Sequence, residues 1–247
     1  MSIAHVEASG AGVAVVLSAA GGQGDDHERI TGSDLLIATG RRPNVEGLDL
    51  DAAGIAHTPA GITVSRGLRT SNRRVYAIGD VTPGPRFTHA ANYHAGLVIR
   101  NALFRLPVKA DDRLIPRVTF TDPELAHVGL TEDEARRARR TIRILRWPFA
   151  ENDRAQAERK TRGHIKVITN KRGRILGATI VGPGAGELIA TWSLALASRL
   201  NIRAFVGTVV PYPTYGEIGK RAAITYFLPS LTSPFVRRII GWLRRLG

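Results

Sequence analysis

Two apolar runs that each end in a glycine-containing turn constrain the fold of this chain most strongly. Leu35 to Asn44 reads Leu-Leu-Ile-Ala-Thr-Gly-Arg-Arg-Pro-Asn, and Val75 to Asp80 reads Val-Tyr-Ala-Ile-Gly-Asp. Each pattern predicts a buried strand followed by a sharp turn, which is where open α/β sheets hold their ligands. Gly79 lets a ligand approach the backbone, and the Asp80 carboxylate can accept hydrogen bonds from sugar hydroxyls. The two runs therefore predict a cofactor site.

Composition narrows the class of protein further. The 247 residues are 43% hydrophobic, which is enough for a packed core in one or two domains. The chain contains no cysteine, so disulfides, thiolate metal ligands and thiol nucleophiles are excluded from this polypeptide. We expect a cytoplasmic location, because no run reaches the ~18 to 20 apolar residues of a membrane span and residues 1–17 lack the pattern of a signal peptide.

The net charge of +14 raises the question of nucleic-acid binding. The basic residues are mostly dispersed along the chain, and the aromatic content of 6% is low for stacking on bases. The dominance of Arg over Lys is also what a biased genome composition produces. We therefore expect no nucleic-acid partner.

Five short motifs carry a resemblance to a known family. In chain order they are Ala38–Asn44, Ala77–Asp80, Phe120–Leu130, Gly184–Ile189 and Tyr212–Glu217. Together they resemble the pyridine nucleotide-disulfide oxidoreductases, the flavoprotein family of dihydrolipoamide dehydrogenase, glutathione reductase and mercuric reductase. Each motif is weak alone, but all five occur in the order of the family and cover residues 30 to 228.

The resemblance implies a fold that is α/β plus α+β, with a partial FAD/NAD(P)-binding Rossmann-like domain followed by an α+β interface (dimerisation) domain. The expected parts are 1–40, the tail of the NAD(P)-binding domain; 41–110, the second half of the FAD-binding domain; 111–232, the dimerisation domain; and 233–247, a basic amphipathic tail. The family's amino-terminal Gly-x-Gly-x-x-Gly turn for FAD, its redox cysteine pair and its nicotinamide turn have no counterpart here. We therefore expect a truncated or split chain that pairs with a separate amino-terminal FAD/NAD(P) half.

Local signals place the elements of the predicted dimerisation domain. Thr131 and Glu134 form a capping box that opens a helix toward Arg140. The other predicted elements are a helix at His89 to Leu103, a strand at Arg117 to Phe120, strands at His164 to Thr169 and Arg174 to Val181 around the hairpin turn Asn170 to Gly173, and helices at Glu187 to Leu200 and Thr214 to Phe227. The expected order is β-α-β-β-β-α-α.

Tyr212 and Glu217 are the predicted catalytic residues. Many disulfide reductases of the family carry a His at the first position of this motif and a Glu five residues later. Tyrosine, with an ordinary pKa near 10, is a poor base at neutral pH but a good hydrogen-bond donor. The departure argues against lipoamide or glutathione chemistry, and Tyr at this place is shared with mercuric reductase-like members. The alternative is structural: Pro213 sets a turn and Glu217 complements a helix dipole.

The resemblance also implies which residues bind the cofactors FAD and NAD(P)H. The predicted cofactor-binding residues are Thr39, Gly40, Gly79, Asp80, Thr88, His89 and Ala90. The alternative for Gly79 and Asp80 is an ordinary turn, and His89 has the character of a helix cap. We expect no metal site, because His89 and His94 are spaced i, i+5 and do not share one helical face.

The last segment carries a separate signal. Apolar residues recur at helical spacing on one face, and arginines occupy the other face. The apolar residues are Phe235, Val236, Ile239, Ile240, Leu243 and Leu246. The basic residues are Arg237, Arg238, Arg244 and Arg245, and Trp242 lies at the edge between the two faces. Such a helix either lies on an anionic membrane surface or docks on its own domain. Gly241 weakens it.

Two classes of function follow from these signals. The first is an FAD-dependent NAD(P)H oxidoreductase, mercuric reductase/dihydrolipoyl dehydrogenase-like, that forms a homodimer in the cytoplasm; a membrane surface is a candidate further partner through 233–247. The absence of cysteine makes mercury reduction or disulfide exchange by this chain alone unexpected. The alternative is a non-catalytic dimerisation-domain remnant.

Overall fold

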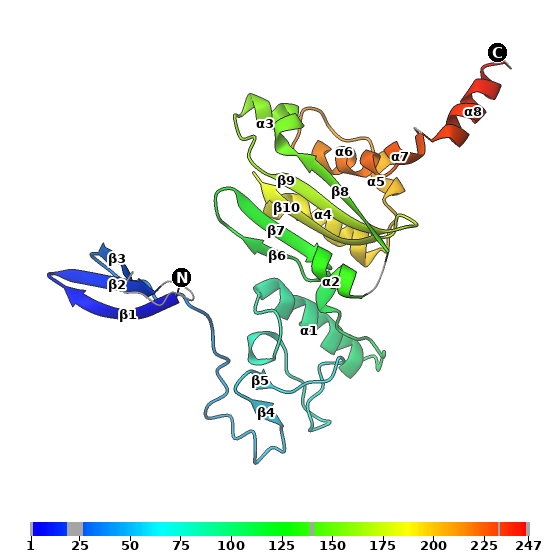
Figure 1. Ribbon diagram of the computed structural model, residues 1–247. Helices are drawn as coiled ribbons and strands as arrows, with labels where there is room; N and C mark the ends of the chain where they lie inside the picture. Colours follow the sequence, from blue (N-terminus) through cyan, green and yellow to red (C-terminus); the bar gives the residue numbers. More distant parts are fainter. Residues whose placement is uncertain (1, 19–26, 139–140, 232, 246–247) are drawn as a thin grey trace. The chain divides into compact units, whose positions relative to one another are not determined.

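A computed structural model describes residues 2–18, 27–138, 141–231 and 233–245 of the chain. The chain divides into two compact units, Met1–Arg42 and Pro43–Gly247, and each is described by itself. Figure 1 shows the helices and strands of both units in chain order.

The first unit is a three-stranded antiparallel sheet. Its strands are β1 (Ser2–Ser9), β2 (Gly12–Ser18) and β3 (His27–Gly32), in the spatial order β1-β2-β3. Gly10 has a φ of 61°, which allows the tight turn that places Ser9 opposite Gly12. Ala14 and Val16 on β2 are buried, whereas β1 is almost entirely exposed.

Two strands predicted from the sequence are wrong in this structure. Residues 35–38 form no strand, and Leu36 and Ile37 are 87% and 76% exposed. In the run from Val75 to Asp80, Tyr76 makes an isolated bridge with Arg69, and the segment then enters the single 3-10 turn η1 (Gly79–Val81). The reason is that a strand needs a continuous ladder to pair with its N–H and C=O groups, and none within the described residues pairs with either run. The second run has only local backbone hydrogen bonds, such as that from the Ala77 N–H to the Leu68 carbonyl.

The second unit opens with a small, loop-rich region. It contains the short hairpin β4 (His57–Thr58) and β5 (Gly61–Ile62) and the helix α1 (Thr88–Ala102), which starts one residue before the predicted helix. Its core is a small cluster of apolar side chains: Leu50, Ile55, Ile62 and Ala77. The helix α1 lies against η1 and buries Ala90, His94 and Leu97.

A five-stranded antiparallel sheet forms the centre of the second unit, in the order β6-β7-β10-β9-β8. The strands are β6 (Arg117–Thr119), β7 (Glu124–Gly129), β8 (Ile142–Pro148), β9 (His164–Asn170) and β10 (Ile175–Gly182). The hairpin turn at Asn170 to Gly173 is confirmed, because the Gly173 N–H donates to the Asn170 carbonyl at 3.0 Å. The predicted order is incomplete: it lacks the strand β7 before the first helix and the short helices at Asp153–Ala157 and Arg203–Gly207.

Helices cover both faces of this sheet (Figure 1). The helices after residue 110 are η2 (Asp112–Leu114), α2 (Glu132–Arg137), η3 (Phe149–Glu151), α3 (Asp153–Ala157), α4 (Ala185–Ala197), α5 (Arg203–Gly207), α6 (Glu217–Thr225), α7 (Leu228–Leu231) and α8 (Pro234–Leu243). Not all of them lie on the sheet: α8 contacts α7 and extends away from the strands. The main core lies between the sheet and α4 and α6, whereas Ala135 of α2 packs with Ile168 and Leu176 in a second cluster. The capping box of Thr131 and Glu134 is confirmed, and residues 139–140 of the predicted helix lie outside the described residues.

Candidate active site

The segment from Tyr212 to Glu217 lies against α3. The Tyr212 hydroxyl donates to Asp153 Oδ2 at 2.7 Å, and the side-chain amide of Asn152 donates to the Thr214 carbonyl at 3.0 Å. Asn152 is buried and also caps α3, because its Oδ1 accepts the Ala155 N–H. One asparagine therefore holds both the start of α3 and the segment that carries Tyr212.

The electrostatics around Tyr212 favour its neutral form. The hydrogen bond and the negative charge of Asp153 raise the pKa of Tyr212, and the Glu217 carboxylate contributes in the same direction. Glu217 is the first residue of α6, where its charge complements the positive end of the helix dipole. The structure thus brings Tyr212 and Glu217 into one electrostatic environment, but the hydrogen-bond partner of Tyr212 is Asp153. Tyr212 is 68% exposed, so a second molecule can reach its hydroxyl and compete with Asp153 for the one proton that it donates.

Replacing Asp153 with asparagine is expected to lower the pKa of Tyr212 toward the ordinary value of 10.0. Asn keeps an acceptor oxygen for the hydroxyl but removes the charge that disfavours tyrosinate. A titration of tyrosinate absorbance, with Tyr212→Phe subtracted to isolate the one tyrosine, measures the shift. Asp133→Asn in the first turn of α2 is the matched control, and an equal shift in that variant contradicts the assignment.

A second tyrosine three residues later forms a separate pair. The Tyr215 hydroxyl donates to Glu158 Oε2 at 2.7 Å, and Glu158 also pairs with Arg154 and Lys160. Burial and the Glu158 bond raise the pKa of Tyr215 to about 12. The Tyr215 and Arg154 hydrogen bonds lower the pKa of Glu158 to about 2. This pair fixes the end of α3 to the loop before α6.

Tyr215→Phe is expected to raise the pKa of Glu158 above about 2, because the largest cause of its depression is removed. Since the folded-state value lies below the ordinary 4.5, the contribution of this carboxylate to stability is present above about pH 4.5 and is lost as the pH falls toward 2. Carbon NMR of the Glu158 carboxyl against pH measures the change. Tyr76→Phe, which removes a hydroxyl bonded to Arg69, is the control and leaves Glu158 unchanged.

The predicted cofactor turn begins at a glycine whose backbone conformation is unfavourable for other residues. Gly79 has a φ of 67°, and a Cβ at this position would stand 3.0 Å from the Ala91 Cβ, so the turn requires glycine. The Gly79 N–H donates to His94 Nδ1 at 3.3 Å, and the Thr82 hydroxyl donates to the Gly79 carbonyl at 2.8 Å. Burial lowers the pKa of His94, which keeps the ring neutral as an acceptor. Asp80 follows on the exposed side of this turn.

The amino terminus of α1 offers backbone donors rather than side chains. The His89 Nε2 lies 2.8 Å from the Pro116 carbonyl, and the ring stacks on Phe87. The Ala90 side chain is buried, and its N–H donates to the Phe87 carbonyl. In the described contacts, the N–H groups of Thr88 and His89 have no acceptor, so these two face outward at the positive end of the helix.

The remaining predicted site residues belong to the first unit. Thr39 and Gly40 are exposed and lie in a segment without a helix or strand. Their role in cofactor binding stays a prediction. Among the residues that the structure describes, no group of three or more His, Asp or Glu side chains is arranged to hold a metal ion.

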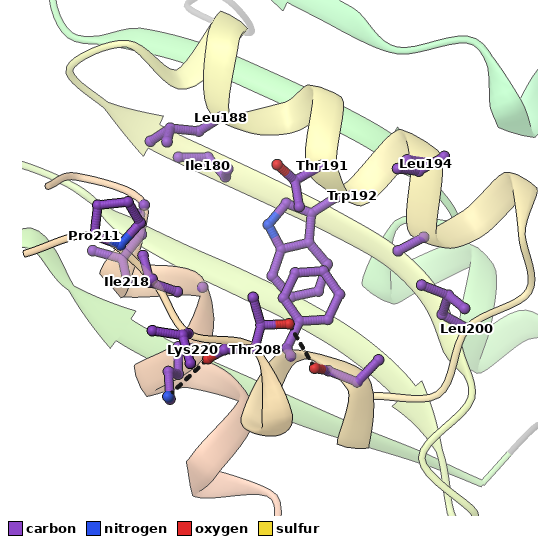
Figure 2. A pocket seen from close by; sticks show the side chains of 17 residues that line it. Ile180, Leu188, Thr191, Trp192, Leu194, Leu200, Thr208, Pro211, Ile218 and Lys220 are labelled. Carbon is purple, nitrogen blue, oxygen red and sulfur yellow. Dashed lines mark hydrogen bonds between the residues drawn. The ribbon is translucent and has the colours of Figure 1, made fainter.

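An apolar cavity of about 300 Å³ between α4, α5 and α6 was not predicted from the sequence. Figure 2 shows Trp192 at its centre, and the Phe205 ring stacks on Trp192 with centroids 3.9 Å apart. The wall is mostly apolar, and the Lys220 ammonium at its edge is bonded to the Thr208 carbonyl. A cavity of this kind suits an apolar side chain. The sequence signal that could have indicated this cavity is the apolar outer face of the predicted helix at Glu187 to Leu200.

Comparison with known proteins identifies the family to which the chain belongs. Residues 3–95 match the family "Pyridine nucleotide-disulphide oxidoreductase", and residues 115–223 match its dimerisation domain. The chain belongs to the pyridine nucleotide-disulfide oxidoreductases, whose members use FAD and NAD(P)H. The partial Rossmann-like part followed by a dimerisation domain, predicted from the motifs, is thereby confirmed.

Individual relatives and solved structures agree with this family. The chain is 39% identical over 199 residues to a mercuric reductase of Staphylococcus aureus, covering 80% of this chain and 36% of that protein. It is 39% identical over 191 residues to a dihydrolipoyl dehydrogenase of Geobacillus stearothermophilus, covering 76% and 40%. The crystal structure of LpdA from Mycobacterium tuberculosis has a TM-score of 0.80 at 28% identity, covering 90% of this chain and 48% of that one. The chain thus spans less than half the length of each.

Proposed function

We propose that this chain is the carboxyl-terminal part of an FAD-dependent NAD(P)H oxidoreductase of the mercuric reductase/dihydrolipoyl dehydrogenase-like type. The observation that carries the proposal is the Tyr212 hydroxyl, held neutral by Asp153 beside Glu217 in the motif where the family is expected to keep its proton-handling group. FAD supplies hydride and electron transfer when bound. Tyr212 donates its hydrogen bond to the reacting substrate in place of Asp153, and the negative charges of Asp153 and Glu217 keep the phenol protonated.

The residues of the second unit fit a flavin. Gly79 keeps side-chain atoms away from the turn, and the outward N–H groups of Thr88 and His89 provide donors and a positive helix end. Asp80 is placed to bind hydroxyl groups. Thr39 and Gly40 belong to this proposal through the family motif that they share.

The proposal includes two protein partners. A second copy of the chain covers exposed apolar side chains of the dimerisation domain, including Leu194 at 65% and Val209 at 91% exposure, and its site receives Tyr212. A separate amino-terminal FAD/NAD(P) half pairs with the runs at 35–38 and 75–78, whose backbone lacks a ladder in the described residues. The cytoplasmic location expected from the sequence is part of the same proposal.

A second candidate is a non-catalytic remnant that keeps only the dimerisation surface. One observation favours it: the sheet β6 to β10 has its own core, whereas the run at Val75 to Gly79 has no sheet around it. In that case residues 43–110 support the dimerisation domain and bind nothing.

Visible absorbance of the purified chain, before and after adding FAD, separates the two candidates, with light scattering on the same sample. A flavin spectrum on a dimer is the result expected for the oxidoreductase. Gly79→Ala is expected to lose the flavin, whereas Gly84→Ala, a strained glycine with a φ of 135° outside the turn, is expected to keep it. A dimer that stays colourless, also when the amino-terminal half is supplied, supports the remnant.

A further inference from the structure

The helix α8 presents an apolar face that stays largely exposed within the described residues. Ser233 caps it by accepting the Val236 N–H, and Pro234 occupies its first turn. At about 100° per residue, Phe235, Ile239 and Leu243 align along one side. Their exposed fractions are 69%, 40% and 50%. The described part of the tail is thus a formed helix whose apolar residues are in solvent; Leu246, predicted to extend the face, lies outside the described residues.

The opposite side of α8 is uniformly basic. Arg237, Arg238 and Arg244 lie on it, followed by Arg245, and the last acidic residue of the chain is Glu217. No carboxylate on α8 or on the neighbouring α7 therefore offsets these charges. Trp242, 60% exposed, lies where the apolar and basic sides meet, the position that an indole prefers at a membrane interface.

The length of α8 shows whether it can cross a membrane or only lie on its surface. Ten residues give a helix of about 15 Å, half of the ~30 Å hydrocarbon thickness of a bilayer. None of the helices in the described residues is long and apolar enough to span a membrane. A short helix with one apolar and one basic side is instead suited to the interface between headgroups and acyl chains.

We propose that α8 docks the protein on the surface of a lipid bilayer that contains anionic lipids. The apolar side enters the interface, and the arginines bind the lipid phosphates. Charge complementarity favours this occupant over a second copy of the chain, because the facing α8 of that copy carries the same positive charge. The inference does not depend on flavin binding, and a homodimer strengthens it because two tails then engage one surface.

Flotation with vesicles tests the proposal on the full chain. The expected result is binding to phosphatidylcholine vesicles that contain phosphatidylglycerol and little binding to phosphatidylcholine alone. Each arginine near an anionic surface contributes about fivefold to partitioning, so Arg237→Gln with Arg238→Gln is expected to weaken binding roughly 25-fold. The matched control is Arg73→Gln with Arg74→Gln, an exposed adjacent pair remote in sequence with the same loss of charge, and it is expected to bind like the parent chain.

The apolar side has its own pair of variants. Ile239→Gln is expected to weaken binding roughly tenfold or more, because one aliphatic side chain no longer enters the interface. Ile99→Gln, which changes an exposed isoleucine of α1, leaves binding unchanged. Equal flotation of all variants, no flotation of the parent chain, or equal binding to neutral vesicles overturns the proposal. A chain that floats but stays colourless even with the amino-terminal half supplied supports this inference while contradicting the oxidoreductase, so the two are distinguishable.

Discussion

Phe149→Ala is expected to lower the free energy of unfolding of the second unit by about 3–5 kcal/mol, the usual cost of truncating a buried Phe. Phe149 is fully buried in η3, directly after the edge strand β8. Its ring meets Gly182, where any Cβ would collide with it, and lies edge-on to Tyr215 at 5.9 Å. Alanine leaves a cavity at this junction, because the backbone of Gly182 has no side chain with which to fill it.

Denaturant unfolding followed by tryptophan fluorescence measures the loss, since Trp192 lies in the same core cluster. Phe120→Ala provides the control: its ring is 81% exposed, and its removal is expected to change stability by no more than about 0.5 kcal/mol. If both variants lose a comparable free energy of unfolding, burial of the Phe149 side chain is not a specific source of stability. Loss of the Phe149 ring is also expected to disturb the candidate active site, because Tyr215 packs on this ring and its hydroxyl bonds to Glu158 at the end of α3.

The parts of the fold that were predicted correctly depend on neighbouring residues. The capping box of Thr131 and Glu134 and the turn from Asn170 to Gly173 are complete within four residues each, so the local chain determines them. The helix predicted at Glu187 to Leu200 is observed two residues earlier at its start and three at its end, a shift typical of helix ends.

The failures concern contacts between distant residues. The run at Val75 to Asp80 has the apolar pattern of a buried strand, but pattern alone does not provide the partner whose backbone must pair with it. Asp153 and Glu158 escaped notice for a similar reason: they lie 59 and 57 residues from the tyrosines they bind. Nothing in the sequence of so short a helix as α3 indicates which hydroxyl will approach its carboxylates.

Tyr212→Phe is expected to reduce turnover by about 10²-fold or more in the assembled oxidoreductase, the scale of losing one preorganised donor at a reacting atom. The phenol keeps its proton because Asp153 raises its pKa, so it acts as a donor rather than a base throughout the neutral range. The assay supplies this chain with the amino-terminal half of the Staphylococcus aureus mercuric reductase and follows NADPH-dependent reduction of an acceptor.

Tyr215→Phe is the matched comparison, since it deletes the same hydroxyl three residues away. Both hydroxyls donate to a carboxylate, but Tyr215 is half-buried with its ring packed on Phe149, so a substrate cannot approach it to take the place of Glu158. Turnover within a few-fold of the parent is therefore expected for Tyr215→Phe. Suppose instead that Tyr212→Phe reduces turnover no more than Tyr215→Phe does, while the flavin is still bound and reduced. The position of the family's proton-handling group is then structural in this chain, and Tyr212 serves only to hold its loop on α3.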